Sequence, residues 1–276
     1  MPKVIKLYLT FFLFSTSLLH VGRVCFCQSK QGAEGALTVR DPTAMAALTQ
    51  AVEALGGVRA IGAISDSLVT ATSTPVGSTQ PQPTSLVWKD AQGEFKVEAQ
   101  EGGVTRAFVS GHGTPAGVTA GKVKQLPPWT ALANPPFHLP GLVLARELAD
   151  PRYTIKMDGA GTVGGASVVR VRTSLDEDRI SSVVSPQEWY LDATTGLPLR
   201  VEFRVPEISH DITHPLDYEA EAFDFSNYQR VGGMLVPHSL AAYSQGSPKA
   251  VIMVTSVNFN QGLSPTEFDA PTGGTQ

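Results

Sequence analysis

Short segments in which apolar and polar residues alternate, separated by glycine and proline turns, dominate this chain from residue 67 onward. A period of two places successive side chains on opposite faces of a β-strand. One such segment alternates four apolar side chains with three charged ones: Leu199, Arg200, Val201, Glu202, Phe203, Arg204 and Val205. The 26 glycines and 20 prolines divide the chain into many segments of this kind. The pattern therefore predicts an antiparallel sheet with one apolar and one polar face.

Eleven segments alternate in this way or are rich in residues that favour strands. They lie at residues 67–74, 86–89, 95–99, 104–109, 153–157, 169–171, 188–191, 199–205, 219–228, 234–243 and 250–259. Residues 111–136, with four glycines and the pair Pro127-Pro128, are expected to form a loop. We therefore expect a mainly β (α+β) fold of nine to eleven antiparallel strands, without parallel βαβ units.

Two helices are expected beside the sheet. Asp41-Pro42 supplies an N-cap and a proline for the first turn, and apolar residues follow at spacings of 3, 4 and 3: Met45, Leu48, Val52 and Leu55. Gly56-Gly57 ends this helix, and Val58 to Ile64 is expected to be a short apolar turn. A second helix is predicted at residues 139–148, because the following Asp150-Pro151 cannot readily continue it.

The N-terminus resembles a secretory signal peptide. Lys3 and Lys6 precede a largely apolar stretch of about fifteen residues, Leu7 to Val21, which is shorter than the ~20 residues of a membrane-spanning helix. Cleavage after Cys27 would place Cys25 and Cys27 at positions −3 and −1. We therefore expect a signal peptide at 1–27, a flexible lead-in at 28–40 and a single domain at 41–272. The protein is predicted to be periplasmic or secreted.

The two cysteines leave a second interpretation open, in which Cys25 or Cys27 carries a lipid anchor. If cleavage instead follows Cys27, the mature chain has no thiol and so no disulfide. Loss of Lys3, Lys6 and Arg23 leaves 18 basic against 25 acidic residues. This negative charge argues against nucleic acid as a partner and against a basic membrane-binding patch.

Only one cluster has the spacing of metal ligands. His210, Asp211 and His214 could share a cation, and a metal-dependent hydrolase is one hypothesis for this chain. However, Pro206 and Pro215 bracket the cluster and disfavour a helix, and the glutamate of an H-E-x-x-H motif is missing. A solvated loop is the preferred interpretation. We expect no catalytic residues and no cofactor.

Three motifs in the C-terminal third resemble the LolA/LolB-like outer-membrane lipoprotein-sorting proteins. The first is the hairpin Trp189-Tyr190-Leu191-Asp192 with Thr195-Gly196-Leu197-Pro198-Leu199-Arg200, similar to W-x-D-x-x-T-G-L-P-x-R. The second is Asn227 to His238, NYQRVGGMLVPH, and the third is Val257-Asn258-Phe259-Asn260 followed by Phe268-Asp269-Ala270-Pro271. The three stand in the order that this family shows.

The resemblance implies a curved antiparallel half-barrel with helices packed in its concave face around an apolar cavity. Such a protein is a non-enzymatic carrier that binds the acyl chains of a lipid or lipoprotein, with envelope membrane proteins as further partners. On this sequence the expected lining residues are Leu48, Val52, Leu55, Trp189, Leu199, Val201 and Phe203. Alternation cannot distinguish a cavity from a filled core, and an envelope structural or interaction module remains an alternative.

Overall fold

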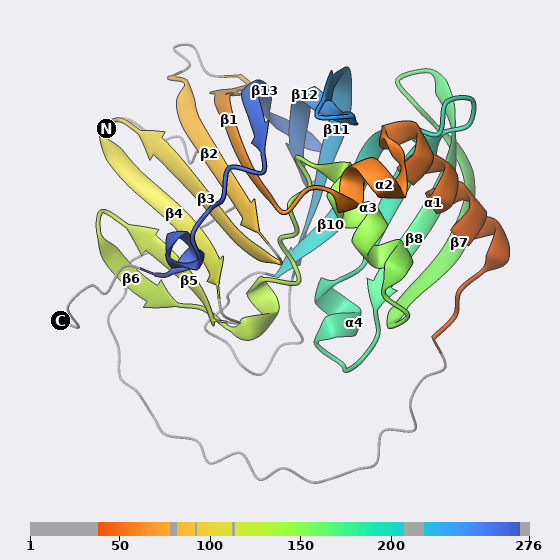
Figure 1. Ribbon diagram of the computed structural model, residues 1–276, viewed down its shortest axis with the longest axis horizontal. Coiled ribbons are helices and arrows are strands. Elements are labelled where there is room, and N and C mark those ends of the chain that lie inside the picture. The colour runs from red at the N-terminus through yellow and green to blue at the C-terminus, as the bar shows by residue number, and fades with distance from the viewer. Residues whose placement is uncertain (1–37, 78–81, 92, 112–113, 207–217, 271–276) are drawn as a thin grey trace, which may run out of the picture.

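The computed structural model describes residues 38–77, 82–91, 93–111, 114–206 and 218–270. These residues form thirteen strands of one antiparallel sheet with a few helices (Figure 1). The strands are β1 (Asp66–Pro75), β2 (Thr84–Ala91), β3 (Glu94–Glu101), β4 (Val104–Gly111), β5 (Thr114–Thr119), β6 (Lys122–Gln125), β7 (Tyr153–Val163), β8 (Ala166–Leu175), β9 (Gln187–Asp192), β10 (Pro198–Pro206), β11 (Tyr218–Val231), β12 (Met234–Ser244) and β13 (Ser247–Phe259). The helices are α1 (Pro42–Leu55), α2 (Gly57–Gly62), α3 (Pro140–Ala149) and α4 (Ser181–Val184), with 3-10 turns η1 (Pro128–Thr130) and η2 (Pro265–Phe268).

Two meanders make up the sheet, which is curved and open. Strands β1 to β6 pair in chain order, as do β7 to β13, and the pairing of β1 with β13 joins the two sets. As a result β6 and β7, although consecutive in the chain, form opposite edges of the sheet. The connection between them, residues 126–152, is called here the crossover segment. It contains η1 and α3 and runs across the concave side of the sheet (Figure 1).

The predicted first helix is present and begins where its cap predicts. The Asp41 carboxylate accepts hydrogen bonds from the backbone N–H groups of Thr43 (2.7 Å) and Ala44 (3.1 Å). Gly56 ends α1 with φ of 137°, and a Cβ there would lie 2.6 Å from the carbonyl oxygen of Gly233, so only glycine fits. The expected apolar turn after it is instead the short helix α2. The second predicted helix corresponds to α3.

The strand count is higher than the nine to eleven expected, because residues 111–136 contain β5 and β6. The sequence of β5 is weak for a strand, since it contains Pro115 and Gly117. These residues pair with Ser110 and Phe108 of β4, so the sheet itself supplies the order that local propensity does not. The loop prediction for this segment was therefore wrong for β5 and β6.

One apolar cluster lies between the sheet and the helices. Helix α1 packs against α3, β7, β8 and β12. The side chains there have no exposed surface, for example those of Leu48, Leu55, Leu144, Ile155 and Trp189. Because interiors of this kind pack as densely as organic crystals, this part of the concave side is filled. No helix in the described ranges is long and apolar enough to cross a membrane.

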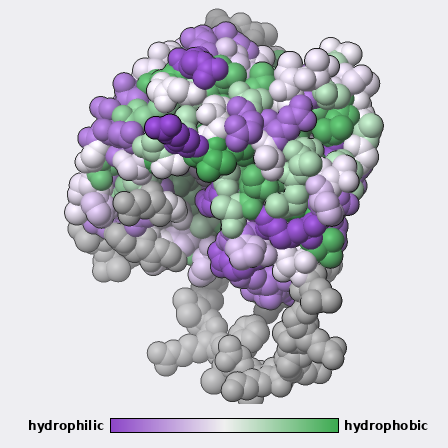
Figure 2. Space-filling model, turned by 45° about the vertical axis from the view of Figure 1, so that its right-hand side comes forward, coloured by the Kyte–Doolittle hydropathy of each residue, from purple (hydrophilic) through white to green (hydrophobic). Residues whose placement is uncertain are grey.

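The opposite face of the sheet is polar, as the alternation predicts. Arg170 pairs with Asp158 (3.2 Å) and Glu188 (3.1 Å) across β7, β8 and β9. Arg200 pairs with Asp224 of β11 (3.0 Å). Figure 2 shows hydrophobic side chains scattered among hydrophilic ones over the face that it draws. The exposed large hydrophobic residues are likewise spread over several elements: Val39, Val58, Val76, Val104, Ile180, Tyr218, Val251 and Met253.

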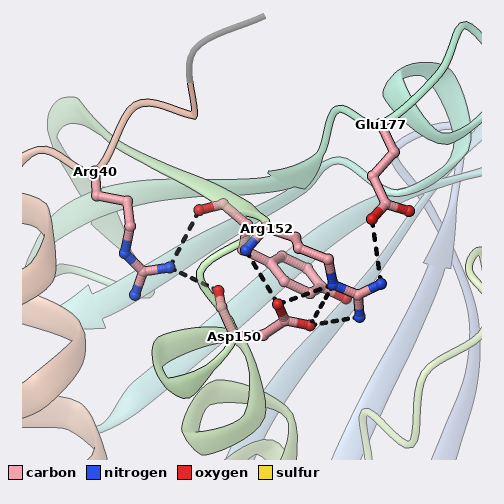
Figure 3. A network of polar contacts seen from close by, with 5 residues as sticks. Arg40, Asp150, Arg152 and Glu177 are labelled. Carbon is pink, nitrogen blue, oxygen red and sulfur yellow. Dashed lines mark hydrogen bonds and ion pairs between the residues drawn. The ribbon is translucent and has the colours of Figure 1, made fainter. Parts of the chain in front are cut away.

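The residues before α1 are attached to β7. The backbone N–H of Ile155 donates to the carbonyl of Val39 (2.8 Å), and Asp41 N–H donates to the carbonyl of Ile155 (2.9 Å). The Arg40 guanidinium donates to the carbonyl oxygen of Asp150 (2.7 Å), at the end of α3 (Figure 3). The last residues of the segment 28–40, predicted to be flexible, are thus held in place. The signal peptide and the domain limits at 41 and 272 stay predictions.

Candidate functional site

An apolar hollow lies between the concave side of the sheet and residues 134–138 of the crossover segment. Its volume is about 60 Å³. Strands β1–β3 and β10–β13 supply its walls, which are mostly aliphatic and aromatic. The lining side chains include Leu86, Trp88, Phe95, Val97, Phe137, His138, Phe203, Val205, Phe223, Leu240, Ala242, Ala250 and Ile252. The hollow thus lies under an irregular segment rather than under α1.

Phe137 projects from the crossover segment into an aromatic cluster at this hollow. Its ring centroid lies 4.3 Å from that of Phe203, 6.0 Å from Trp189 and 6.2 Å from Phe223. The residue is only 3% exposed. Since stacked and tilted rings at these distances attract one another, Phe137 anchors the crossover segment over the hollow.

His138 holds the next position of the crossover segment against β2. Its ring stacks on Trp88 with centroids 4.5 Å apart, and its Nε2 lies 3.3 Å from Oδ2 of Asp90. The Ser67 hydroxyl donates to the same Asp90 oxygen at 3.0 Å. The other oxygen of Asp90, Oδ1, is buried and has no hydrogen-bond partner among the described residues. One edge of the hollow therefore carries a buried polar group.

A larger and more polar groove adjoins the hollow. It has a volume of about 510 Å³ and shares Phe95, Asn134 and Pro135 with the hollow as lining residues. Small-molecule sites usually measure roughly 300–1,000 Å³. The groove falls in this range and the hollow does not. In this structure the hollow is therefore too small for an acyl chain.

The residues predicted from sequence to line a cavity occupy two environments. Phe203 lines the hollow, whereas five others belong to the packed apolar core: Leu48, Val52, Leu55, Trp189 and Val201. Leu199 is half-buried and lies at a bulge between Pro198 and Arg200, where the pairing of β10 with β9 shifts. Contact of these residues with a ligand stays a prediction.

The sequence interpretation missed the crossover contribution, above all Phe137 and His138. The available signal was an aromatic residue directly after Pro135-Pro136, in a stretch without strand or helix periodicity. An aromatic side chain in such a segment is buried only if the segment passes over an apolar surface. The crossover segment does so because β6 and β7, which it connects, lie at opposite edges of the sheet.

A second buried acid lies under α3. Glu147 has no exposed surface, and burial raises the pKa of its carboxyl group from 4.5 to about 7. Neighbouring Arg146 lowers this pKa, as do the facing side chains of Thr173, Gln187 and Trp189, but only in part. Neither carboxyl oxygen of Glu147 forms a well-aligned hydrogen bond with a described residue. The protonated form therefore fits this site best.

The described ranges contain no group of three or more His, Cys, Asp or Glu side chains that could hold a metal ion. The cluster His210, Asp211 and His214 lies outside the described residues, as do Cys25 and Cys27. The metal-site and lipid-anchor hypotheses stay predictions.

A curved open antiparallel sheet, crossed on its concave side by a segment that encloses an apolar hollow, defines the class of protein. No protein-family model matches the sequence, and no curated protein matches it. Solved structures of this class match most of the chain.

The first is described as an outer membrane lipoprotein-sorting protein domain from Vibrio parahaemolyticus, with 18% identity and a TM-score of 0.52 over 82% of this chain and 97% of that one. A DUF1329 family protein from Desulfovibrio piger has 14% identity and a TM-score of 0.54 over 85% of this chain and 100% of that one. A LolA superfamily protein from Nitrosomonas europaea has 10% identity and a TM-score of 0.52, covering 82% and 97%. At these identities the likeness establishes the fold, and it confirms the LolA-like fold that the three motifs indicate.

Proposed function

We propose that this protein is a non-enzymatic carrier that reversibly buries the acyl chains of a lipid or lipoprotein between its sheet and the crossover segment. The observation that supports this proposal is the apolar hollow, which shares three lining residues with a groove of ligand size. The fold is also that of a lipoprotein-sorting protein domain. With the predicted signal peptide, such a carrier would work in the periplasm or outside the cell and exchange cargo with envelope membrane proteins.

The energy of binding comes from apolar burial. At roughly 25 cal/mol per Å² of apolar surface, an acyl chain of a few hundred Å² gains several kcal/mol. Displacing Phe137 from its ring contacts opposes binding, because its own apolar surface is then exposed. This cost offsets part of the gain from burying the acyl chain, which favours release of the cargo as well as its uptake.

The adjacent residues Ala241 and Ala242 of β12 provide a matched test. Ala242 lines the hollow and pairs with buried Ala250, whereas Ala241 pairs with Val251, which is 37% exposed on the outer face. Ala242→Phe fills the hollow and is expected to reduce uptake of a fluorescent fatty acid at least about tenfold, a loss of roughly 1.4 kcal/mol. Ala241→Phe is expected to leave uptake unchanged.

Native mass spectrometry of the wild-type protein, purified from a membrane-containing host, should also reveal bound lipid. Thermal unfolding of both variants checks that they fold. Equal uptake by the folded Ala242→Phe and Ala241→Phe variants, or no lipid and no uptake in the wild type, would overturn the carrier proposal.

A further inference from the structure

We propose that the groove beside the hollow binds a lipid head group that carries both a phosphate and a primary ammonium group, while the acyl chains enter the hollow. This inference rests on the proposed carrier function and adds a ligand class to it. It is supported by an unpaired carboxylate oxygen of Asp90, by an arginine without an ion pair among the described residues, and by the wall that the groove and the hollow share.

One lining residue of the groove has a side-chain oxygen in need of a donor. Asp90 is 8% exposed, and its Oδ1 has no hydrogen-bond partner among the described residues. A buried acceptor without a partner destabilises the folded protein. A ligand that donates a hydrogen bond to this oxygen would remove part of that cost.

A cationic side chain lies on the helix side of the groove. Leu142 and Arg146 are four residues apart and so share one face of α3, and both line the groove together with Asp150, which follows the helix. Arg152, which also lines it, is already held by Asp150 (2.7 Å) and Glu177 (3.1 Å), as Figure 3 shows. In the part of the chain that the structure describes, the exposed Arg146 guanidinium has no such ion pair. A guanidinium with free N–H groups suits a phosphate, which it can bind through two parallel hydrogen bonds.

These features together select the head group. A primary ammonium can donate to the carboxylate of Asp90, and a phosphate has acceptor oxygens for Arg146. Because the groove and the hollow share Phe95, Asn134 and Pro135 as lining residues, a head group in the groove leaves its chains beside the hollow. A choline head group has the same charge and phosphate but no N–H donor, so it provides a closely matched comparison.

The experiment compares lipids with identical acyl chains in competition with a fluorescent fatty acid: phosphatidylethanolamine, phosphatidylcholine, phosphatidylglycerol and diacylglycerol. We expect the wild-type protein to bind phosphatidylethanolamine about tenfold more tightly than phosphatidylcholine, the difference expected for hydrogen bonds to a charged group. Diacylglycerol, which lacks the phosphate, should bind more weakly than any of the phospholipids.

Two variants assign the effect to the groove. Asp90→Asn keeps an oxygen for the Ser67 hydroxyl but removes the charge, and should reduce the preference for ethanolamine over choline. Arg146→Gln should weaken all phospholipids relative to diacylglycerol. Arg59→Gln, at an exposed helix position outside the groove, is the matched control and should change neither ratio.

The outcomes separate the two proposals. Uptake of all lipids with equal affinity for ethanolamine and choline head groups in the wild type would overturn the head-group site and leave the carrier function standing. Loss of the ethanolamine preference in Arg59→Gln as well would also overturn the site. Failure of every lipid to bind would overturn both proposals. Since the head-group comparison is made on the wild type, it remains decisive even if Asp90→Asn does not fold.

Discussion

The two halves of the concave side are covered in different ways. Helices α1 and α3 cover β7, β8 and β12, and the side chains between them, such as Leu48, Leu55 and Leu144, are fully buried. Residues 134–138 cover β1–β3 and β10–β13 and leave a hollow of about 60 Å³. A helix presents a continuous apolar stripe that interdigitates with a sheet. An irregular segment containing Pro135-Pro136 presents few side chains, mainly Phe137 and His138. The apolar hollow therefore lies under the irregular half.

Removing a large side chain from each half is the strongest test of this difference. Phe137→Ala and Leu48→Ala should lower the free energy of unfolding by about 3–5 and about 2–5 kcal/mol, respectively. Added lipid should restore stability to Phe137→Ala, because the new space joins the hollow, but not to Leu48→Ala. Denaturant unfolding with and without lipid measures this. Equal rescue of both variants would show that the halves do not differ.

The buried acid under α3 allows a second test, which concerns the packed half alone. The pKa of Glu147 is about 7 in the folded protein against 4.5 for an ordinary glutamate, so its contribution to stability is full below about pH 4.5 and is lost as the pH rises through 7. At 1.36 kcal/mol per pKa unit this loss is on the order of 3 kcal/mol. Glu147→Gln should therefore be more stable than the wild type at pH 8 and similar to it at pH 4.5.

Urea unfolding across this pH range provides the measurement. Arg146 and Tyr153 are the other titratable groups that act on Glu147 or respond to it, and both keep one charge state below pH 8. Exposed Glu53→Gln is the control and should follow the wild-type profile. A Glu147→Gln profile that runs parallel to the wild type would contradict the assignment.

The smallest effect is expected at the junction of the halves, where Arg152 joins Asp150 to Glu177 (Figure 3). The Arg152 side chain is 59% exposed, so Arg152→Gln should lower the free energy of unfolding by only about 0.2–1 kcal/mol. The difference should shrink in high salt. A loss of several kcal/mol that does not respond to salt would show that this network, rather than apolar packing, holds the end of α3 to the segment that follows β8.

Much of the fold could be predicted where local chemistry and tertiary structure agree. The Asp41 cap, the Gly56 end of α1 and the hairpin of β9 and β10 all follow from short-range patterns. Strand β5 could not be predicted, because Pro115 and Gly117 disfavour a strand and only pairing with β4 imposes one. The position of Leu199 also escaped prediction, since the bulge beside Arg200 interrupts the two-residue alternation.

The sequence predicted the apolar character of the candidate site but only part of its position. The sequence indicated an apolar inner face and named Phe203, which lines the hollow. It assigned the covering role to α1, whose apolar stripe was visible in the sequence, whereas the hollow is covered by Phe137 and His138. No periodic pattern marks these two residues, so their role depends on the path of the crossover segment.

The sequence by itself determined the two faces of the sheet and the ends of α1, because alternation and capping act between residues close in the chain. The tertiary structure alone decided that β6 and β7 lie at opposite edges and that residues 126–152 must cross between them. It also decided where the interior is filled and where it is hollow. Space inside a protein depends on which surfaces meet, and that depends on residues far apart in the sequence.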